Sequence, residues 1–111
     1  MAQKTEERNI DLSKAEVVNN KNNRQFEIRV GDLVAKIPYN FKDDMIALFH
    51  TEVPDEWRRK GIATRLTGYA LNYAKDNDLK ILPYCPFIAK YIKEHPEWKP
   101  HVKRFVSGTD Y

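Results

Sequence analysis

Hydrophobic and polar residues alternate in the first half of the chain, and this alternation predicts β-strands. In the clearest segment Phe26, Ile28 and Val30 share one face, while Glu27 and Arg29 point the other way. Such a period of two is typical of a strand with one face against a core and one face in water.

Further strands and short turns are predicted around this segment. Ala15–Val18 starts a first strand, and the polar stretch Asn19–Arg24 is typical of a turn. Gly31-Asp32 suits a tight hairpin, and Lys42–Asp44 suits the next turn. The apolar run Met45–Val53 predicts a central strand covered on both faces. The strand between the two turns would carry on one face the residues Leu33, Ala35, Ile37 and Tyr39. The first half is therefore predicted to be an antiparallel meander.

After Pro54 the apolar spacing changes to three and four residues, which predicts an amphipathic helix. We expect it to start at Gly61 or Ile62 and to run to about Asp76. Its apolar stripe consists of Ile62, Leu66, Tyr69, Ala70 and Tyr73.

A short buried strand and a second helix follow. Leu79–Leu82 is the strand, and Pro86 suits the first position of the helix, which ends at His95-Pro96. The tail Trp98–Tyr111 is typical of irregular structure, with Phe105 and Val106 as anchors. The apolar face of the second helix consists of Phe87, Ile88, Tyr91 and Ile92.

Strands followed by helix–strand–helix predict the α+β class, a sandwich of sheet and helices. We expect residues 1–111 to form a single domain, with frayed ends at about 1–9 and 107–111.

Composition narrows the function classes. No apolar run reaches the roughly 18 residues of a membrane-spanning helix, and we expect no secretory signal peptide. The single cysteine, Cys85, excludes an internal disulfide and a Cys-cluster metal site, and the three histidines lack metal-ligand spacing. We therefore predict a protein of the reducing cytoplasm. The net charge of +3 suits a partner that carries phosphates, without separating nucleic acid from a phosphorylated cofactor.

A basic loop ahead of the first helix is the strongest candidate site. Arg58, Arg59 and Lys60 precede Gly61, where the helix opens. A helix start offers unpartnered N–H groups and a positive dipole end, and glycine lets a phosphate approach the backbone. This pattern indicates pyrophosphate binding, although it matches neither of the common Gly-rich phosphate loops. The alternative is a solvated basic loop before an ordinary helix.

This segment carries a resemblance to a known family. Arg58–Ala63 matches the Arg/Gln-x-x-Gly-x-Gly/Ala signature of the GNAT superfamily of acetyl-CoA-dependent N-acetyltransferases. Together with His50–Arg58, Leu79–Phe87, Tyr91 and His95–Trp98, it resembles the branch of small, single-domain members. The resemblance extends from about Phe26 to Trp98.

The resemblance implies a GNAT-like fold in which one strand splays to hold the pantetheine arm of CoA and the signature loop holds the pyrophosphate. The matching arm residues are Thr51, Glu52 and Val53. The matching phosphate residues are Arg58, Arg59, Lys60, Gly61, Ile62, Ala63 and Thr64. Larger members place two helices between their first two strands, and the Asn19–Arg24 turn leaves no room for them. The acceptor amine, a small molecule or a protein lysine or N-terminus, therefore stays open.

Three further residues are candidates for the chemistry. Cys85 is predicted to cap the second helix, where a thiolate is favoured, so it is either a reactive thiol or a small buried hydrophobe. His50, expected on the central strand on the face of Ile46 and Leu48, is either a base for the incoming ammonium or a hydrogen-bonded core residue. Tyr91 either protonates the CoA thiolate, contacts pantetheine or only packs.

We therefore interpret the sequence as a minimal acetyl-CoA-dependent N-acetyltransferase that uses either direct transfer or a Cys85 acyl-enzyme. A backbone N–H near Thr51–Val53 would stabilise the oxyanion. The alternative is a non-catalytic CoA-binding or basic nucleic-acid-binding module, although we do not expect nucleic acid as a partner.

Overall fold

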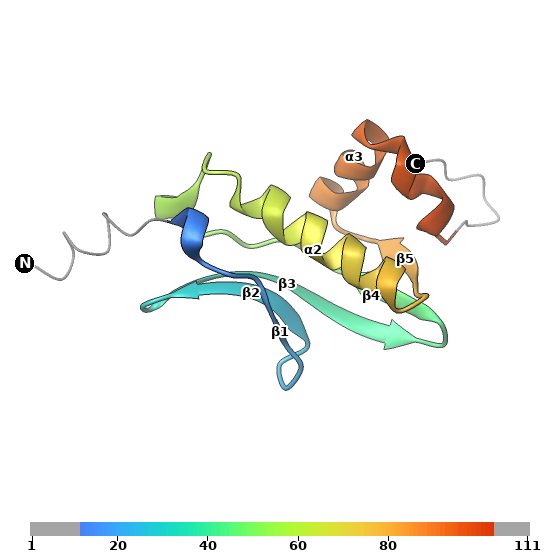
Figure 1. Ribbon diagram of the computed structural model, residues 1–111, viewed down its shortest axis with the longest axis horizontal. Coiled ribbons are helices and arrows are strands. Elements are labelled where there is room, and N and C mark those ends of the chain that lie inside the picture. The colour runs from blue at the N-terminus through green and yellow to red at the C-terminus, as the bar shows by residue number, and fades with distance from the viewer. Residues whose placement is uncertain (1–11, 104–111) are drawn as a thin grey trace, which may run out of the picture.

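The computed structural model describes residues 12–103, and its strands form one mixed sheet in the order β1-β2-β3-β4-β5 (Figure 1). The first four strands pair antiparallel, and β5 pairs parallel with β4. The predicted antiparallel meander is thus confirmed. The strand bounds are β1 Val18–Asn20, β2 Gln25–Val30, β3 Leu33–Lys42, β4 Met45–Leu48 and β5 Lys80–Pro83.

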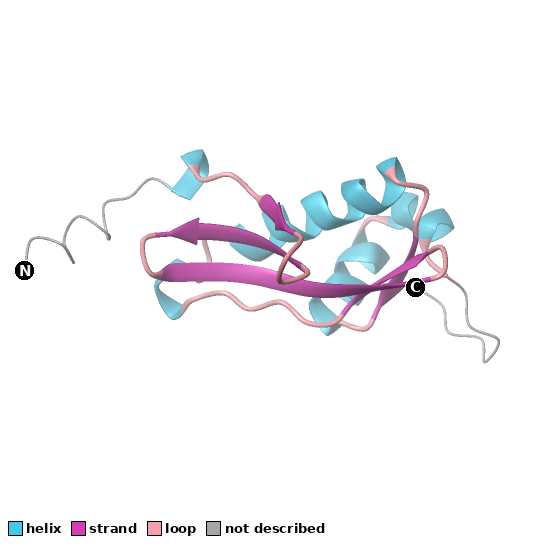
Figure 2. Cartoon of the chain, turned by 90° about the horizontal axis from the view of Figure 1, so that it is seen from below, coloured by secondary structure: helices cyan, strands magenta, loops and turns pink. Residues whose placement is uncertain are grey.

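Two α-helices follow the meander, as the change in apolar spacing predicted. They are α2 (Ile62–Asp76), which connects β4 to the parallel strand β5, and α3 (Pro86–Glu94). Figure 1 shows both helices on the same side of the strands, and Figure 2 shows the chain from below, after a turn of 90°. Three short 3-10 helices complete the described chain, namely η1 Leu12–Lys14, η2 Asp55–Trp57 and η3 Pro96–His101. The structure is the expected α+β arrangement.

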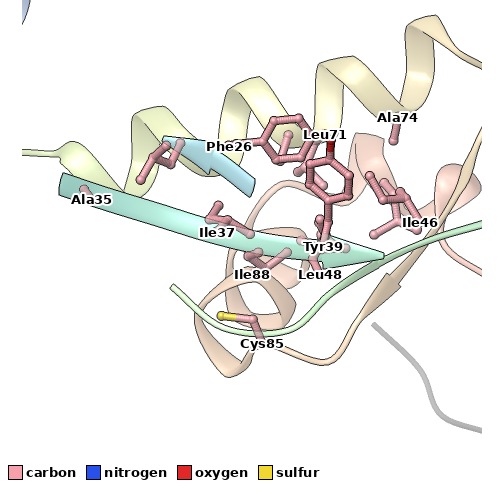
Figure 3. Close-up of a cluster of buried hydrophobic side chains, with 14 of the residues drawn as sticks. Phe26, Ala35, Ile37, Tyr39, Ile46, Leu48, Leu71, Ala74, Cys85 and Ile88 are labelled. Carbon is pink, nitrogen blue, oxygen red and sulfur yellow. The ribbon is translucent and has the colours of Figure 1, made fainter. Parts of the chain in front are cut away.

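The core lies between the sheet and the helices. Phe26 of β2 is fully buried, and its ring lies 4.6 Å from that of Tyr39 and 5.3 Å from that of Tyr73. Figure 3 shows this cluster under α2, with Cys85 and Ile88 at its edge. Each large apolar side chain buried in this way contributes about 1.5–3 kcal/mol. The fully buried residues include Ile28, Ile37, Ile46, Leu48, Leu66, Leu71, Ile81, Ile88 and Ile92.

The first strand and the turn after it differ from the prediction. The strand begins at Val18 and not at Ala15, and the turn is confined to residues 21–24. Asn19 belongs to the strand because it pairs with Phe26 and its side chain accepts a 2.6 Å hydrogen bond from the Tyr39 hydroxyl. Two polar residues that are typical of turns are therefore held in a strand by partners distant in sequence.

Glu27 also departs from its predicted position in water. Its side chain is buried, accepts hydrogen bonds from Gln25 and Asn20, and lies 3.5 Å from the Arg29 guanidinium. Burial raises the pKa of Glu27, but these hydrogen bonds and the charge of Arg29 outweigh it, and the pKa is lowered from its usual value. The second face of β2 is therefore a polar network rather than a solvated surface.

The segment after α3 is more regular than predicted, because Pro96–His101 forms η3 instead of irregular chain. Val102, which follows, is buried and bridges to Ile81 beside β5. The predicted anchors Phe105 and Val106, and the ends expected to fray, lie outside the described residues. Within residues 12–103, no helix is long and apolar enough to cross a membrane.

Candidate functional site

The strand predicted over Met45–Val53 ends at Leu48, because the chain then gains one residue relative to β3. Tyr39 pairs with Leu48, and Lys36 pairs with Glu52. Between these pairs, residues 37–38 of β3 lie opposite residues 49–51. Phe49 still donates to Pro38, so residues 50 and 51 together lie opposite Ile37. This two-against-one arrangement is a β-bulge, which disrupts the ladder and bends the strand. The central strand is thus four residues long, and the expected site residues lie on the bulge and just beyond it.

Several backbone donors at the bulge and just beyond it have no partner in the described part of the chain. The N–H of Phe49 donates to Pro38, and that of Glu52 donates to Lys36. Within residues 12–103, the N–H groups of His50, Thr51 and Val53 make no such hydrogen bond. Of the arm residues expected from the resemblance, Thr51 and Val53 therefore present free donors, whereas the N–H of Glu52 between them pairs with β3.

Cys85 occupies the predicted cap position of α3, with Pro86 in the first turn. Its N–H donates to the carbonyl of Leu48 at 3.0 Å, and its sulfur lies 3.2 Å from the Thr51 hydroxyl. The side chain belongs to the core, with 2% of the residue exposed. The structure thus places Cys85 against the bulge. Its burial fits the role of a small buried hydrophobe, and its predicted role as a reactive thiol stays a prediction.

His50 does not lie where the sequence analysis placed it. It was expected on the central strand on the face of Ile46 and Leu48, but it lies past the end of β4 with 53% of its side chain exposed. The extra residue of the bulge turns the ring away from the core. Its Nε2 atom lies 2.5 Å from Glu52, whose carboxylate also lies 3.9 Å from Lys36. The core-histidine interpretation is therefore wrong, and the side chain is accessible.

The start of α2 has the backbone geometry expected of an anion site. Gly61 caps the helix in the left-handed region at φ 77°, and Arg59 is also left-handed at φ 62°. The first helical N–H with a partner belongs to Arg65, which donates to Gly61 at 3.0 Å. The N–H groups of residues 62–64 therefore project without partners within the described chain. A β-carbon built on Gly61 would meet nothing within 4 Å, so the approach is open.

The side chains around this helix start divide into two groups. Arg58, Arg59, Lys60 and Thr64 are exposed, and Arg58 lies 3.1 Å from the exposed carboxylate of Asp55. Ile62 is buried in the core, and Ala63 is half-buried. Arg59 and Lys60 can therefore meet an anion with their charges, whereas Ile62 can contribute only its backbone.

Tyr91 is half-buried and packs against the core. Its ring stacks on His95 at 4.0 Å, and the His95 side chain lies 2.8 Å from the Tyr91 carbonyl. These contacts account for its packing, and its predicted role at pantetheine stays a prediction.

Arg65 is a residue that the sequence analysis missed. Its guanidinium donates to the carbonyl of Leu12 at 2.7 Å and also to that of Ala15. These hydrogen bonds hold the segment before β1 against the first turn of α2, beside the candidate anion site. No sequence signal marked this role, because the partners are backbone groups about 50 residues away along the chain.

Comparisons with known proteins show the family and the fold. The family model for the GCN5-related N-acetyltransferase matches residues 25–101. Protein NATD1 of Mus musculus is 39% identical over 83 residues, which cover 72% of this chain and 76% of the relative. Protein NATD1 of Danio rerio is 33% identical over 100 residues, covering 86% and 91%. The NMR structure of a GCN5-like protein from Staphylococcus aureus superposes with a TM-score of 0.66, at 24% identity, covering 89% of this chain and 98% of that one.

Proposed function

The chain belongs to the GCN5-related N-acetyltransferase family, and on that premise we propose that it transfers an acetyl group from acetyl-CoA to an amine. The observation that carries the proposal is the coincidence of two rows of unpartnered N–H groups, one after β4 and one at the start of α2. Each row lies where the family resemblance expects a part of CoA.

The residues present fit the cofactor. A pyrophosphate is an anion that accepts several hydrogen bonds, and the start of α2 offers the N–H groups of residues 62–64 beside the open surface of Gly61. The exposed charges of Arg59 and Lys60 would strengthen this binding. Arg58 would either keep its ion pair with Asp55 or exchange it for a phosphate.

The pantetheine arm would lie along the bulge, where Thr51 and Val53 present their N–H groups. When bound, acetyl-CoA supplies a thioester carbonyl as an activated acyl donor. One of these N–H groups would stabilise the negative charge that develops on the carbonyl oxygen, an effect typically worth about 100- to 1,000-fold in rate. The backbone of Glu52 would not hold the pantetheine arm, because it already pairs with Lys36. Its side chain lies against His50.

His50 would accept the proton of the incoming ammonium. The ring is exposed, and the carboxylate of Glu52 at 2.5 Å would hold its orientation. We favour direct transfer, in which Cys85 forms no covalent intermediate, because its sulfur is buried against Thr51. Mass spectrometry after mixing with acetyl-CoA alone tests this preference, because a stoichiometric acetyl-Cys85 that chases into product would contradict it.

Family membership favours this proposal over the alternative of a non-catalytic CoA- or nucleic-acid-binding module. The module would bind CoA without turnover, or would bind polynucleotide with an affinity that falls steeply with salt. Release of free CoA that depends on an added amine therefore separates the enzyme from both versions of the module.

The cofactor assignment is tested by thermal unfolding with and without acetyl-CoA. Ligand at a hundred times its Kd should add about 2.7 kcal/mol of stability. Gly61→Asp should abolish this increase because it places a carboxylate at the phosphate site.

Gly31→Asp is the matched control for this experiment. Gly31 is also left-handed, at φ 60°, so the two variants carry the same charge and a similar backbone strain. However, Gly31 lies in the β2–β3 hairpin, away from α2. Equal melting of the unsubstituted protein with and without saturating acetyl-CoA would overturn the assignment.

A further inference from the structure

Two aromatic residues stand side by side where β4 and β5 stop pairing. Leu48 and Pro83 are the last paired residues of the two strands, and Phe49 and Tyr84 follow them directly. The two rings stack, with centroids 6.1 Å apart and planes 5° apart. They are nevertheless 41% and 56% exposed, so their outer surfaces are free within the described structure. Exposed paired rings of this kind mark a surface that contacts something else.

The pair faces the side of the sheet that no described helix covers. Leu48 and Ile81 point into the core beneath the helices. Phe49 follows the inward-facing Leu48 and still pairs with Pro38, so its ring points to the opposite side, and Tyr84 joins it there through the ring contact. Figure 2 shows this side without a helix in front of the strands. Leu82 of β5, next to the inward-facing Ile81, is only 5% exposed, so the exposed surface here is that of the two rings and not of the whole sheet face.

This position lies beside the reacting centre of the proposed function. Phe49 directly precedes the bulge, and the N–H groups of His50 and Thr51 come next. On the inner side, Thr51 contacts the buried Cys85, so the core closes that approach. An acceptor must therefore arrive across the open side, over the two rings and next to the exposed His50.

We infer that Phe49 and Tyr84 form the acceptor wall of the site and select amines whose nitrogen is carried on a flexible alkyl stem, such as the lysine side chain. This inference rests on the proposed function. The rings offer flat apolar surface to methylene groups, and their faces attract an ammonium before it loses its proton. The open surface suits a stem that projects from a larger molecule, because no described element encloses it.

The test is a series of primary amines from methylamine to pentylamine, together with Nα-acetyl-lysine amide. We expect kcat/KM to rise about two-fold for each added methylene, roughly half the effect of complete burial because one side of the stem stays in water. Phe49→Ala combined with Tyr84→Ala should remove this dependence on stem length. Tyr84→Phe keeps the ring and should preserve it.

Phe41→Ala is the matched control, because Phe41 is an equally exposed ring, at 46%, on β3. It should leave the series unchanged. The acetyl-CoA thermal shift, measured on every variant, shows that folding and the cofactor site are intact.

The outcomes separate the inference from the function on which it rests. A kcat/KM that does not depend on stem length, or a preference for aniline-type amines, would overturn the acceptor wall alone. No turnover of any amine by a protein that acetyl-CoA still stabilises would contradict the proposed function, and the acceptor wall with it. If acetyl-CoA does not stabilise the protein, the proposed function fails and the acceptor wall fails with it.

Discussion

Strand β3 pairs along one edge with β2 and along the other with the segment that includes β4, and the two pairings differ. The β2 ladder is continuous from Gln25–Pro38 to Val30–Leu33. The other pairing breaks after Leu48 and resumes one residue out of step at Glu52. The continuous ladder uses its backbone groups for stability, whereas along the broken one the N–H groups of residues 50, 51 and 53 have no backbone partner within the described chain.

The comparison shows how one strand serves both purposes. In the ladder, strict alternation buries Phe26 and Ile28 against α2. At the break, the extra residue lets Thr51 meet Cys85 while His50 points outward. The irregularity is tolerated because the regular part of the sheet and its core support it.

Deletion of His50 would remove this difference and should have the largest effect. Residues 37–38 would then lie opposite two residues, and the ladder would run without a bulge from Leu48 to Glu52. We expect the chain to fold but to lose most of the stabilisation by acetyl-CoA, because the strand would lose its bend together with the free N–H of residue 50. Thermal unfolding with and without the cofactor measures this.

His50→Gln is the control for the deletion, because it keeps the bulge and removes only the imidazole. We expect it to retain the thermal shift while acetyl transfer falls about 100- to 10,000-fold. A deletion variant that still gained full stability from acetyl-CoA would show that the bulge is not needed to bind it.

Ile28→Ala tests the opposite role, that of the continuous ladder. Ile28 is fully buried, so its truncation should cost about 2–5 kcal/mol of unfolding free energy. Urea unfolding measures this loss. The Kd for acetyl-CoA, determined on the folded fraction, should be unchanged, and a weakened Kd would show that the ladder and the site are coupled.

Glu27 gives the smallest expected effect and concerns the outer face of the ladder. Its pKa is lowered on folding, so its contribution to stability is present above the unfolded-state value near 4.5 and is lost as the pH falls through the folded-state value. Glu27→Gln should therefore cost about 1 kcal/mol at pH 7 and less in acid.

Urea unfolding at pH 7 and pH 3 compares the Glu27 variant with Glu94→Gln. Glu94 is an exposed glutamate at the end of α3, and its substitution should have little effect at either pH. A Glu27→Gln cost that does not change with pH would contradict the proposed contribution of the charge.

Much of the fold followed from local patterns. The alternation around Ile28 and the turn at Gly31-Asp32 predicted the hairpin that the structure contains. The spacing after Gly61 predicted α2 within its observed bounds, and Pro86 predicted the start of α3. These signals succeed because each element is specified by neighbours in sequence, through strand alternation, helix periodicity and capping.

The site was less predictable than the fold. The basic loop and the glycine at the helix start were visible because their geometry is local. The bulge was hidden, because an apolar run such as Met45–Val53 does not reveal where a partner strand will lose register. The burial of Glu27 was hidden for the same reason, since it depends on Asn20 across the strand pair.

The sequence by itself determined the order of the elements, the residues that form the core, and the family signature at the start of α2. Only the tertiary structure decided that His50 is exposed, that Thr51 meets Cys85, and that Phe49 stacks on Tyr84. The first two of these outcomes depend on one extra residue measured against β3, and the third depends on the pairing of β4 with β5. Register is a relation between two strands, and neither strand carries it alone.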